Sequence, residues 1–277
     1  VGFFHLTNHA FFKALLFLSA GSIIHSVADE QDMRKMGGLK KLIPFTYVIT
    51  TIGSLALIGF PYFTGFYSKD LILEIAYSKY SFLGFCSYCL GTIVAYVTAY
   101  YSMRLVFLTF LTKPVGYKQV ISFACDCGLS IFISLIFLAL PSILIGYYSK
   151  DLIVGLGNNV LNSILYINLK NYNFLDSEYI NVFLKNLPVC FSILGFLFAY
   201  IFYIFNFKFL FKLKLSQIGK KIYFFLNRKW FFDKIYCEYI GQLFFNFAYS
   251  TSYKFIDKGI FEILGPTCFS NIVLCVI

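Results

Sequence analysis

The segment from Phe3 to about His25 restricts the fold most, because it is nearly all apolar and about as long as a membrane span. In lipid, a single segment must satisfy its own backbone polar groups, so such a run folds as a helix. Three titratable side chains interrupt it at intervals of four residues: His5, His9 and Lys13. On a helix these positions span about 80° of one face. The sequence therefore predicts a membrane helix that carries a polar stripe.

Lys13 lies near the middle of this predicted helix. A lysine there costs about 2.5–3.5 kcal/mol even on a lenient insertion scale, so its side chain should face protein or water. Because imidazole titrates near physiological pH, histidines can relay protons. We therefore expect the stripe to transfer protons, and protons to enter or leave it near His25 and Asp29, at the mouth of the helix. The alternative is structural: a buried cation, with histidines that bond a neighbouring helix.

Composition extends the membrane assignment to the whole chain. Hydrophobic residues make up 59% of the sequence and charged residues 13%, whereas soluble domains contain about 25% charged residues. This excludes a water-soluble enzyme. The net charge of +10 comes from basic residues that cluster at span ends, where they set orientation, so no nucleic-acid partner is expected. The eight cysteines show neither a disulfide framework nor a paired metal-ligand pattern, so no metal or cofactor site is expected.

The second apolar segment, 44–77, is too long for one straight crossing. Gly59, Pro61 and Gly65 fall in its interior; proline removes a helical hydrogen bond, and glycine loosens the chain. We expect a broken helix here. A break at membrane depth is tolerated where it is buried in protein or lines a cavity, and such breaks recur at transport sites.

Lys69 and Asp70 follow just beyond the expected break. Adjacent residues on a helix point about 100° apart, so these two side chains need not pair with each other. Their position favours a second proton-handling site, at the far end of the path from His25. The alternative is a lysine at a helix end whose ammonium reaches the membrane surface.

Three more membrane helices are expected, at about 82–111, 124–148 and 188–210, with a polar loop between the last two. From Ser216 onward, charges interrupt the apolar residues too often for a span. Residues 211–277 are therefore expected to form an amphipathic segment at the membrane surface. The last apolar run holds only about ten residues, too few to cross a bilayer.

Basic residues in the connections predict the orientation. The connections 27–43, 112–118 and 208–229 hold four, two and seven lysines and arginines. The connections on the opposite side, 68–80 and 149–187, hold two and three. The first three loops are therefore expected to face the matrix or cytoplasm, and the stripe to run between the two aqueous phases.

Several blocks of the sequence resemble those of a known protein family. They are 3–26 (FFHLTNHAFFKALLFLSAGSIIHS), 29–39 (DEQDMRKMGGL), 61–74 (PYFTGFYSKDLILE), 141–151 (PSILIGYYSKD), 229–242 (KWFFDKIYCEYIGQ) and 257–266 (DKGIFEILGP). In this order they closely resemble the subunit 5 family of NADH dehydrogenase, the distal antiporter-like subunits of respiratory complex I. The resemblance covers essentially the whole chain.

The resemblance implies an all-α integral membrane fold with about five transmembrane helices, one of them discontinuous. Residues 1–111 would be the second half of the second antiporter-like repeat, and 112–210 two further helices. Residues 211–277 would be an amphipathic segment and the start of a lateral helix. The resemblance also places the family's proton-conducting positions at His5, His9 and Lys13, and its terminal lysine and neighbour at Lys69 and Asp70.

The resemblance also implies partners and a compartment. The chain would be a piece of the proton-pumping membrane arm of NADH:ubiquinone oxidoreductase in the mitochondrial inner membrane. FMN, iron–sulfur clusters and ubiquinone would be held by other subunits, and a phospholipid such as cardiolipin could bind here. The expected partners are the chain that supplies the missing N-terminal helices, the adjacent antiporter-like subunit 4 and the lipid bilayer.

We expect a C-terminal fragment of a subunit 5 protein, from a split mitochondrial gene. Two other functions stay open. One is a structural membrane-arm subunit without active proton transfer, and the other is a subunit of a multisubunit cation/proton antiporter.

Overall fold

The computed structural model describes residues 1–155 and 176–276, and all regular structure within these ranges is helical. The chain divides into two compact units, Val1–Phe207 and Lys208–Ile277. Each unit is described by itself.

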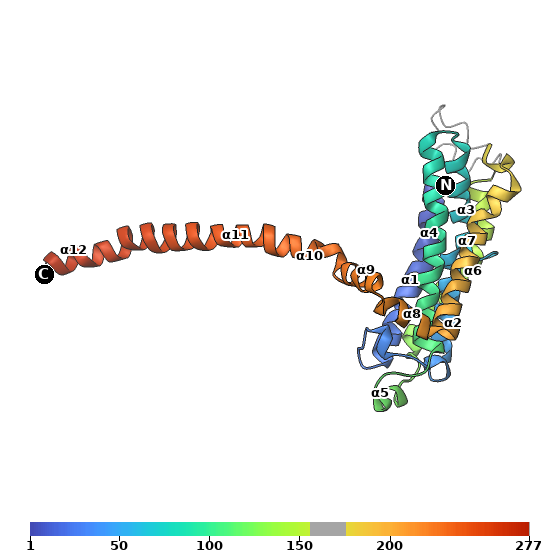
Figure 1. Ribbon diagram of the computed structural model, residues 1–277, viewed down its shortest axis with the longest axis horizontal. Coiled ribbons are helices and arrows are strands. Elements are labelled where there is room, and N and C mark those ends of the chain that lie inside the picture. The colour runs from blue at the N-terminus through green and yellow to red at the C-terminus, as the bar shows by residue number, and fades with distance from the viewer. Residues whose placement is uncertain (156–175, 277) are drawn as a thin grey trace. The chain divides into compact units, whose positions relative to one another are not determined.

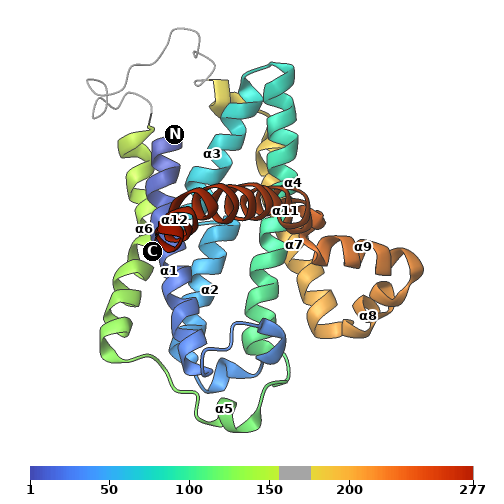
Figure 2. The same ribbon diagram turned by 90° about the vertical axis from the view of Figure 1, so that its left-hand side faces the viewer.

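The first unit is a bundle of long helices (Figures 1 and 2). Its long helices are α1 (Gly2–Ser26), α2 (Pro44–Ile58), α3 (Thr64–Ser78), α4 (Phe82–Val106), α6 (Leu129–Ile153) and α7 (Val182–Tyr200). Wider π-type turns, η3 (Phe107–Leu111) and η5 (Ile201–Phe205), extend α4 and α7, and the connections carry the short helices η1 (Met33–Lys35), η2 (Leu39–Lys41) and α5 (Lys118–Ser122).

Among the described residues of this bundle, three helices are long and apolar enough to cross a membrane: Phe82–Leu111, Leu129–Ile153 and Val182–Phe205. Helix α1 is not among them, since its polar stripe interrupts its apolar sequence. It is nevertheless 25 residues long, about 37 Å, and packs against α2, α3 and α6. The predicted bundle of membrane helices is confirmed.

The predicted helix break is also confirmed. Helix α2 ends at Ile58, and α3 begins at Thr64. Gly59 has a φ of +82°, a left-handed conformation that favours glycine. The Phe60 amide donates back to the Leu55 carbonyl at 3.0 Å, which closes α2 with the hydrogen bond typical of a helix C-terminus. Pro61 follows and cannot continue the helix.

Close backbone contacts fix the start of α3. A Cβ on Gly65 would lie 1.9 Å from the Ala56 carbonyl oxygen, so only glycine fits against α2. The Thr64 hydroxyl donates to the Pro141 carbonyl at 3.0 Å and accepts from the Gly146 amide at 3.2 Å, both on α6. The break is therefore held between two neighbouring helices, as expected of irregular backbone at membrane depth.

The expected boundaries of the last two bundle helices were wrong. The span expected at 124–148 begins and ends later, as α6, and the span expected at 188–210 lies earlier, at Val182–Phe205. The Asn181 side chain starts α7 by accepting from the Phe183 amide at 3.1 Å. Pro188 therefore lies inside the helix, where it leaves the Leu184 carbonyl without its usual donor. The Tyr88 hydroxyl of α4 donates to that carbonyl at 2.6 Å.

Small residues let α4 and α7 approach closely. A Cβ on Gly195 would lie 2.3 Å from the Tyr96 carbonyl oxygen and 3.0 Å from the Ala99 Cβ. In lipid, close backbone approach through glycine and alanine is a main source of helix association. It gives α7 a fixed position beside α4.

The connections lie at two opposite ends of the bundle, as Figure 2 shows. Residues 27–43 and 112–128 share one end, where the Asp126 carboxylate accepts from the Phe45 and Thr46 amides at 3.2 Å each. An anion there satisfies free amides at the start of α2. The turn after α3 and residues 176–181, which precede α7, lie at the other end.

The second unit begins within α8 (Phe207–Leu215) and contains α9 (Gln217–Asn227) and one helical run, Lys229–Val276. This run comprises η6 (Lys229–Phe231), α10 (Phe232–Lys234), η7 (Ile235–Gly241), α11 (Gln242–Asn246), η8 (Phe247–Phe261), η9 (Ile263–Thr267) and α12 (Cys268–Val276). Figure 1 labels α10, α11 and α12 along it.

The run Lys229–Val276 is 48 residues long and contains an 18-residue window apolar enough to cross a membrane. The expectation that no segment beyond Ser216 reaches that hydropathy was therefore wrong. The last charged residue of the run is Glu262, and the uncharged residues that follow it make a longer apolar stretch than the last ten residues alone indicate.

Candidate functional site

The His5 side chain joins the polar stripe of α1 to α3. Its Nδ1 lies 3.0 Å from the Ser68 Oγ, a hydrogen-bond distance. Ser68 is fully buried and directly precedes Lys69 in the sequence. The two predicted proton-handling sites, which are far apart in the sequence, therefore meet at this contact.

The rest of the stripe follows the rim of the buried face of α1. The rings of His5 and His9 are 5.8 Å apart between centroids. Lys13 is half-buried, and its Nζ lies 5.3 Å from the centroid of the Phe17 ring, within cation–π range. Asn8, which directly precedes His9, is buried. Its Nδ2 has no hydrogen-bond partner in the described part of the chain.

Lys69 points into the helix break. Its Nζ donates to the Ile58 carbonyl at 3.1 Å and to the Thr98 hydroxyl of α4 at 3.2 Å. Ile58 is the last residue of α2, where carbonyls lack intrahelical donors and the helix dipole favours a cation. The ammonium therefore lies within the bundle and does not reach for the membrane surface.

Asp70 and Glu74 are both buried on α3, four residues apart. Asp70 does not pair with Lys69 in the described part of the chain, and its Oδ2 has no hydrogen-bond partner there. The Glu74 Oε2 lies 3.6 Å from the Nζ of Lys185 on α7. The carboxylates thus continue from the break toward the end of the bundle.

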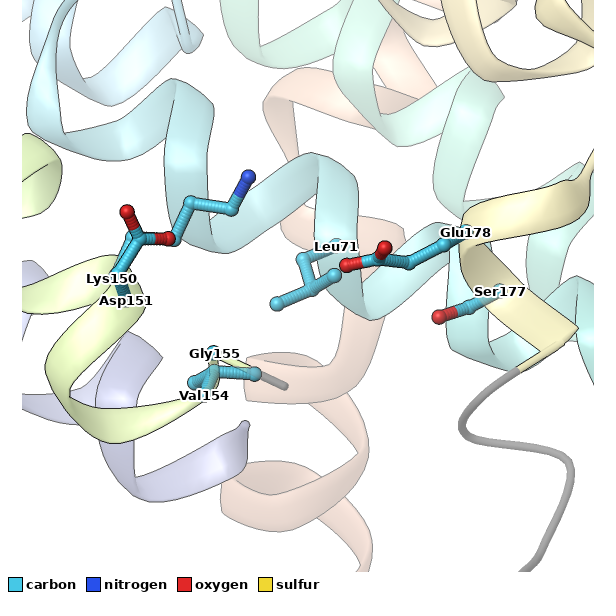
Figure 3. A pocket seen from close by; sticks show the side chains of 7 residues that line it. All are labelled: Leu71, Lys150, Asp151, Val154, Gly155, Ser177 and Glu178. Atoms are coloured by element: carbon cyan, nitrogen blue, oxygen red, sulfur yellow. The ribbon is translucent and has the colours of Figure 1, made fainter. Parts of the chain in front are cut away.

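A pocket of about 210 Å³, lined by both charged and apolar residues, lies at that end. Figure 3 shows Lys150 and Glu178 projecting toward each other from opposite sides, with Leu71 of α3 between them. It is lined by Leu71, Lys150, Asp151, Val154, Gly155, Ser177 and Glu178.

His25 and Asp29 lie away from this cluster, at the opposite end of α1. Both are exposed. His25 is in the last turn of the helix, and Asp29 follows in a left-handed conformation with a φ of 62°. Lys13 is twelve residues before His25, about 18 Å along the helix axis. The predicted mouth is thus on the surface, and the structure does not bring it into contact with the stripe.

Two sequence families match this chain. The family described as "NADH:quinone oxidoreductase/Mrp antiporter, TM" matches residues 2–98, which include the stripe, the break and most of α4. The family described as "NADH dehydrogenase subunit 5 C-terminus" matches residues 101–277, more than half of the chain.

The chain belongs to the NADH dehydrogenase subunit 5 family.

Curated members of the subunit 5 family are similar along nearly the whole chain. "NADH-ubiquinone oxidoreductase chain 5" of Phytophthora infestans is 53% identical over 263 residues, which are 95% of this chain and 40% of that protein. The proteins of the same name from Marchantia polymorpha and Arabidopsis thaliana are 49% and 46% identical, each over 96% of this chain and 40% of their own length. The chain thus spans about two-fifths of the curated relatives it matches.

Several residues of this subunit 5 site were not predicted from the sequence. Ser68 and Thr98 are hydroxyl partners of His5 and Lys69, and neither is distinguished from other buried serines and threonines in the sequence. Glu74 lies at the i+4 position from Asp70, a spacing that could have indicated a shared helix face. Its partner Lys185 comes from a helix whose start was misplaced, so no sequence signal pointed to it.

The connection after α1 contains two local ion pairs, Arg34 with Asp32 and Lys35 with Glu30. Arg34 donates hydrogen bonds from its side chain and backbone to the Asp32 carboxyl, which lowers the pKa of that group to about 2. Lys35 donates to Glu30 at 2.8 Å and lowers the pKa of that carboxyl as well. The loop therefore carries fixed ion pairs at one end of the bundle.

Proposed function

We propose that this chain forms part of a proton path in the membrane arm of NADH:ubiquinone oxidoreductase. Its relatives carry the name of that enzyme's chain 5. Quinone reduction takes place in other subunits, which hold FMN, the iron–sulfur clusters and ubiquinone. This chain carries no redox step of its own and contributes proton transfer that is coupled to that chemistry.

The contact between His5 and Ser68 is the observation that supports this proposal most. It joins titratable groups on α1 to the break between α2 and α3. Histidines, a half-buried lysine and a broken helix are the elements that proton and ion transporters use. A purely structural set of polar residues would not require their continuity across two helices.

The path begins at His25 and Asp29 on the basic side of the membrane. Protons then pass along Lys13, His9 and His5 toward α3. The centroid separation of 5.8 Å between the two imidazoles is short enough for one bridging water. Lys13 is half-buried on the same helix, so its side chain lies beside this path and not in the lipid.

Beyond His5 the path continues through Ser68 to Lys69 and Asp70. Lys69 is held by the last carbonyl of α2, and Asp70 has a buried oxygen without a partner in the described part of the chain. The break therefore controls the exit of the proton path, on the side of the membrane where the connections carry fewer basic residues.

The remaining proposals concern partners and location. The chain works with a polypeptide that supplies the other helices of a subunit 5 bundle and with the adjacent antiporter-like subunit 4. It lies in the mitochondrial inner membrane, with loops 27–43, 112–118 and 208–229 on the matrix side, and cardiolipin is a suitable bound lipid for its basic segments. Phe and Tyr number 36 and 22, a bias that AT-rich organellar coding would produce.

A subunit of a multisubunit cation/proton antiporter is the less favoured function, since the match over residues 101–277 is to the subunit 5 family. Purification of the tagged chain distinguishes the two. We expect an NADH:quinone reductase to co-purify with it, and an assembly without that activity would contradict the proposal.

A structural subunit with an idle polar stripe is the other alternative. Proton uptake by the reconstituted complex tests it, wild type against a His9→Ala, Lys13→Ala double variant. We expect NADH-driven uptake to fall in the variant while quinone reduction continues. Equal uptake in the two forms would support the structural role.

A further inference from the structure

The carboxylates of Asp70 and Glu74 form a line that leads away from the helix break. Both residues are buried on α3, with 9% and 7% of their surface exposed. Side chains four residues apart on a helix are neighbours, with Cβ atoms about 5–6 Å apart. Asp70 has a buried Oδ2 without a hydrogen-bond partner in the described part of the chain, so one end of the line is an unsatisfied acceptor.

The other end of the line meets a lysine that reaches water. The Nζ of Lys185 lies 3.6 Å from the Glu74 Oε2, and the two side chains are 44% and 8% exposed. Lys185 lies in the first turn of α7, where the helix dipole also favours a nearby anion. Glu74 is therefore a buried carboxylate whose only cation within ion-pair distance, in the described part of the chain, stands between it and the solvent.

Other ionisable groups surround Glu74. Lys150 of α6 and Glu178, which precedes α7, act on it electrostatically and line the pocket at this end of the bundle. Tyr88 of α4 also interacts electrostatically with Asp70 and Glu74, and its hydroxyl donates to the Leu184 carbonyl. Helices α4, α6 and α7 and the residues just before α7 thus each bring a polar or charged group near Glu74, which is typical of a pathway through a membrane protein and costly for a merely structural contact.

We propose that Glu74 is the last proton carrier beyond Asp70 and that Lys185 is the gate that keeps external protons from returning. A proton leaves the Asp70 carboxyl, binds a Glu74 carboxylate oxygen and then passes to water at the end of the bundle. The Lys185 ammonium stabilises the carboxylate form of Glu74, which favours release of its proton, and its position between Glu74 and the solvent repels protons that approach from outside. This inference rests on the proposed function.

Two substitutions in the assembled complex separate these roles. In vesicles, Glu74→Gln should lower the number of protons pumped per NADH by as much as Lys13→Ala does, because an amide of the same shape does not bind and release a proton. Lys185→Gln should instead raise the passive leak of protons back through the complex, most at low external pH, and Lys185→Arg should restore the wild-type leak. Lys79→Gln is the control, an exposed lysine just after α3.

If Glu74 and Lys185 formed only a structural ion pair, Glu74→Gln and Lys185→Gln would not have opposite effects on proton conductance. If Glu74→Gln pumps as wild type while Lys13→Ala does not, the inference is overturned and the proposed function stands. If neither variant lowers pumping, the proposed function itself fails. Should Glu74→Gln prevent assembly, the leak in Lys185→Gln decides: a raised leak supports the gate, and an unchanged leak contradicts it.

Discussion

The Nζ of Lys69 lies 3.1 Å from the carbonyl oxygen of Ile58, across the break between α2 and α3. The lysine thus closes the end of the helix that precedes it, while Asp70, about 100° further around α3, faces elsewhere. Movement of this one ammonium would at once free a helix terminus and a hydroxyl, that of Thr98. The break and the lysine therefore act as one unit.

Removing the second acceptor of Lys69 should impair this unit. In Thr98→Val the ammonium loses the hydroxyl 3.2 Å away, and a hydrogen bond to a charged group contributes about 1.5–3 kcal/mol. We expect slower NADH-driven proton uptake with the complex fully assembled. Thr92→Val on the same helix is the control, since that hydroxyl donates to the Cys89 carbonyl of its own helix; equal losses in both variants would contradict the role of Thr98.

Gly65 should not tolerate a side chain. A methyl group there would lie 1.9 Å from the Ala56 carbonyl oxygen, so Gly65→Ala must push α3 from α2. Overpacking of this kind costs about 1–3 kcal/mol, and the amount of assembled complex on native gels should fall. Gly21→Ala in α1 should leave assembly intact, because a Cβ there meets nothing within 4 Å. Normal assembly of Gly65→Ala would show that the close approach is not required.

The bridge from α1 to α3 can be tested through its hydroxyl. Ser68→Ala removes the partner of His5, whereas Ser54→Ala removes a buried hydroxyl that bonds the Thr51 carbonyl of its own helix. We expect the first variant to slow proton transfer and the second to behave as wild type. The rate of proton uptake at saturating NADH is the measurement, and unchanged uptake in Ser68→Ala would argue against the bridge.

Much of the bundle could be predicted because the residues that determine it act through their own backbone preferences and their spacing in the sequence. Gly59, Pro61 and Gly65 break a helix through their own backbone preferences, so the break is visible in the sequence. The interval of four between His5, His9 and Lys13 likewise fixes a shared face before any packing is known.

The features that were missed depend on partners from distant segments. The sequence predicts a helix start at Pro188, but α7 begins earlier, at Val182. The helix continues through Pro188 because the Tyr88 hydroxyl donates to the Leu184 carbonyl, which the proline leaves without a donor. The ion pair of Glu74 with Lys185 is invisible for the same reason, since it needs α3 and α7 side by side. Contacts of this kind between helices leave no periodic pattern in the sequence that would predict them.

Acid should weaken the connection after α1 over a defined range. Because hydrogen bonds from Arg34 lower the pKa of Asp32 to about 2 in the folded protein, against about 3.9 when unfolded, the pair stabilises the loop fully above pH of about 4. The stabilisation is lost as the pH falls toward about 2. Carboxyl NMR of the chain in micelles should give a midpoint near 2, and Arg34→Gln should move it toward the ordinary value. Lys40→Gln should not, and an unmoved midpoint in Arg34→Gln would be inconsistent with this pairing.

The number of protons pumped per NADH by complexes with Lys13→Ala tests the central claim most directly. Lys113→Ala, at an exposed loop lysine, is the matched control. A proton path through α1 predicts a lower ratio in Lys13→Ala, with quinone reduction retained, and a wild-type ratio in Lys113→Ala. A wild-type ratio in Lys13→Ala would contradict the account, because the stripe would then carry no protons.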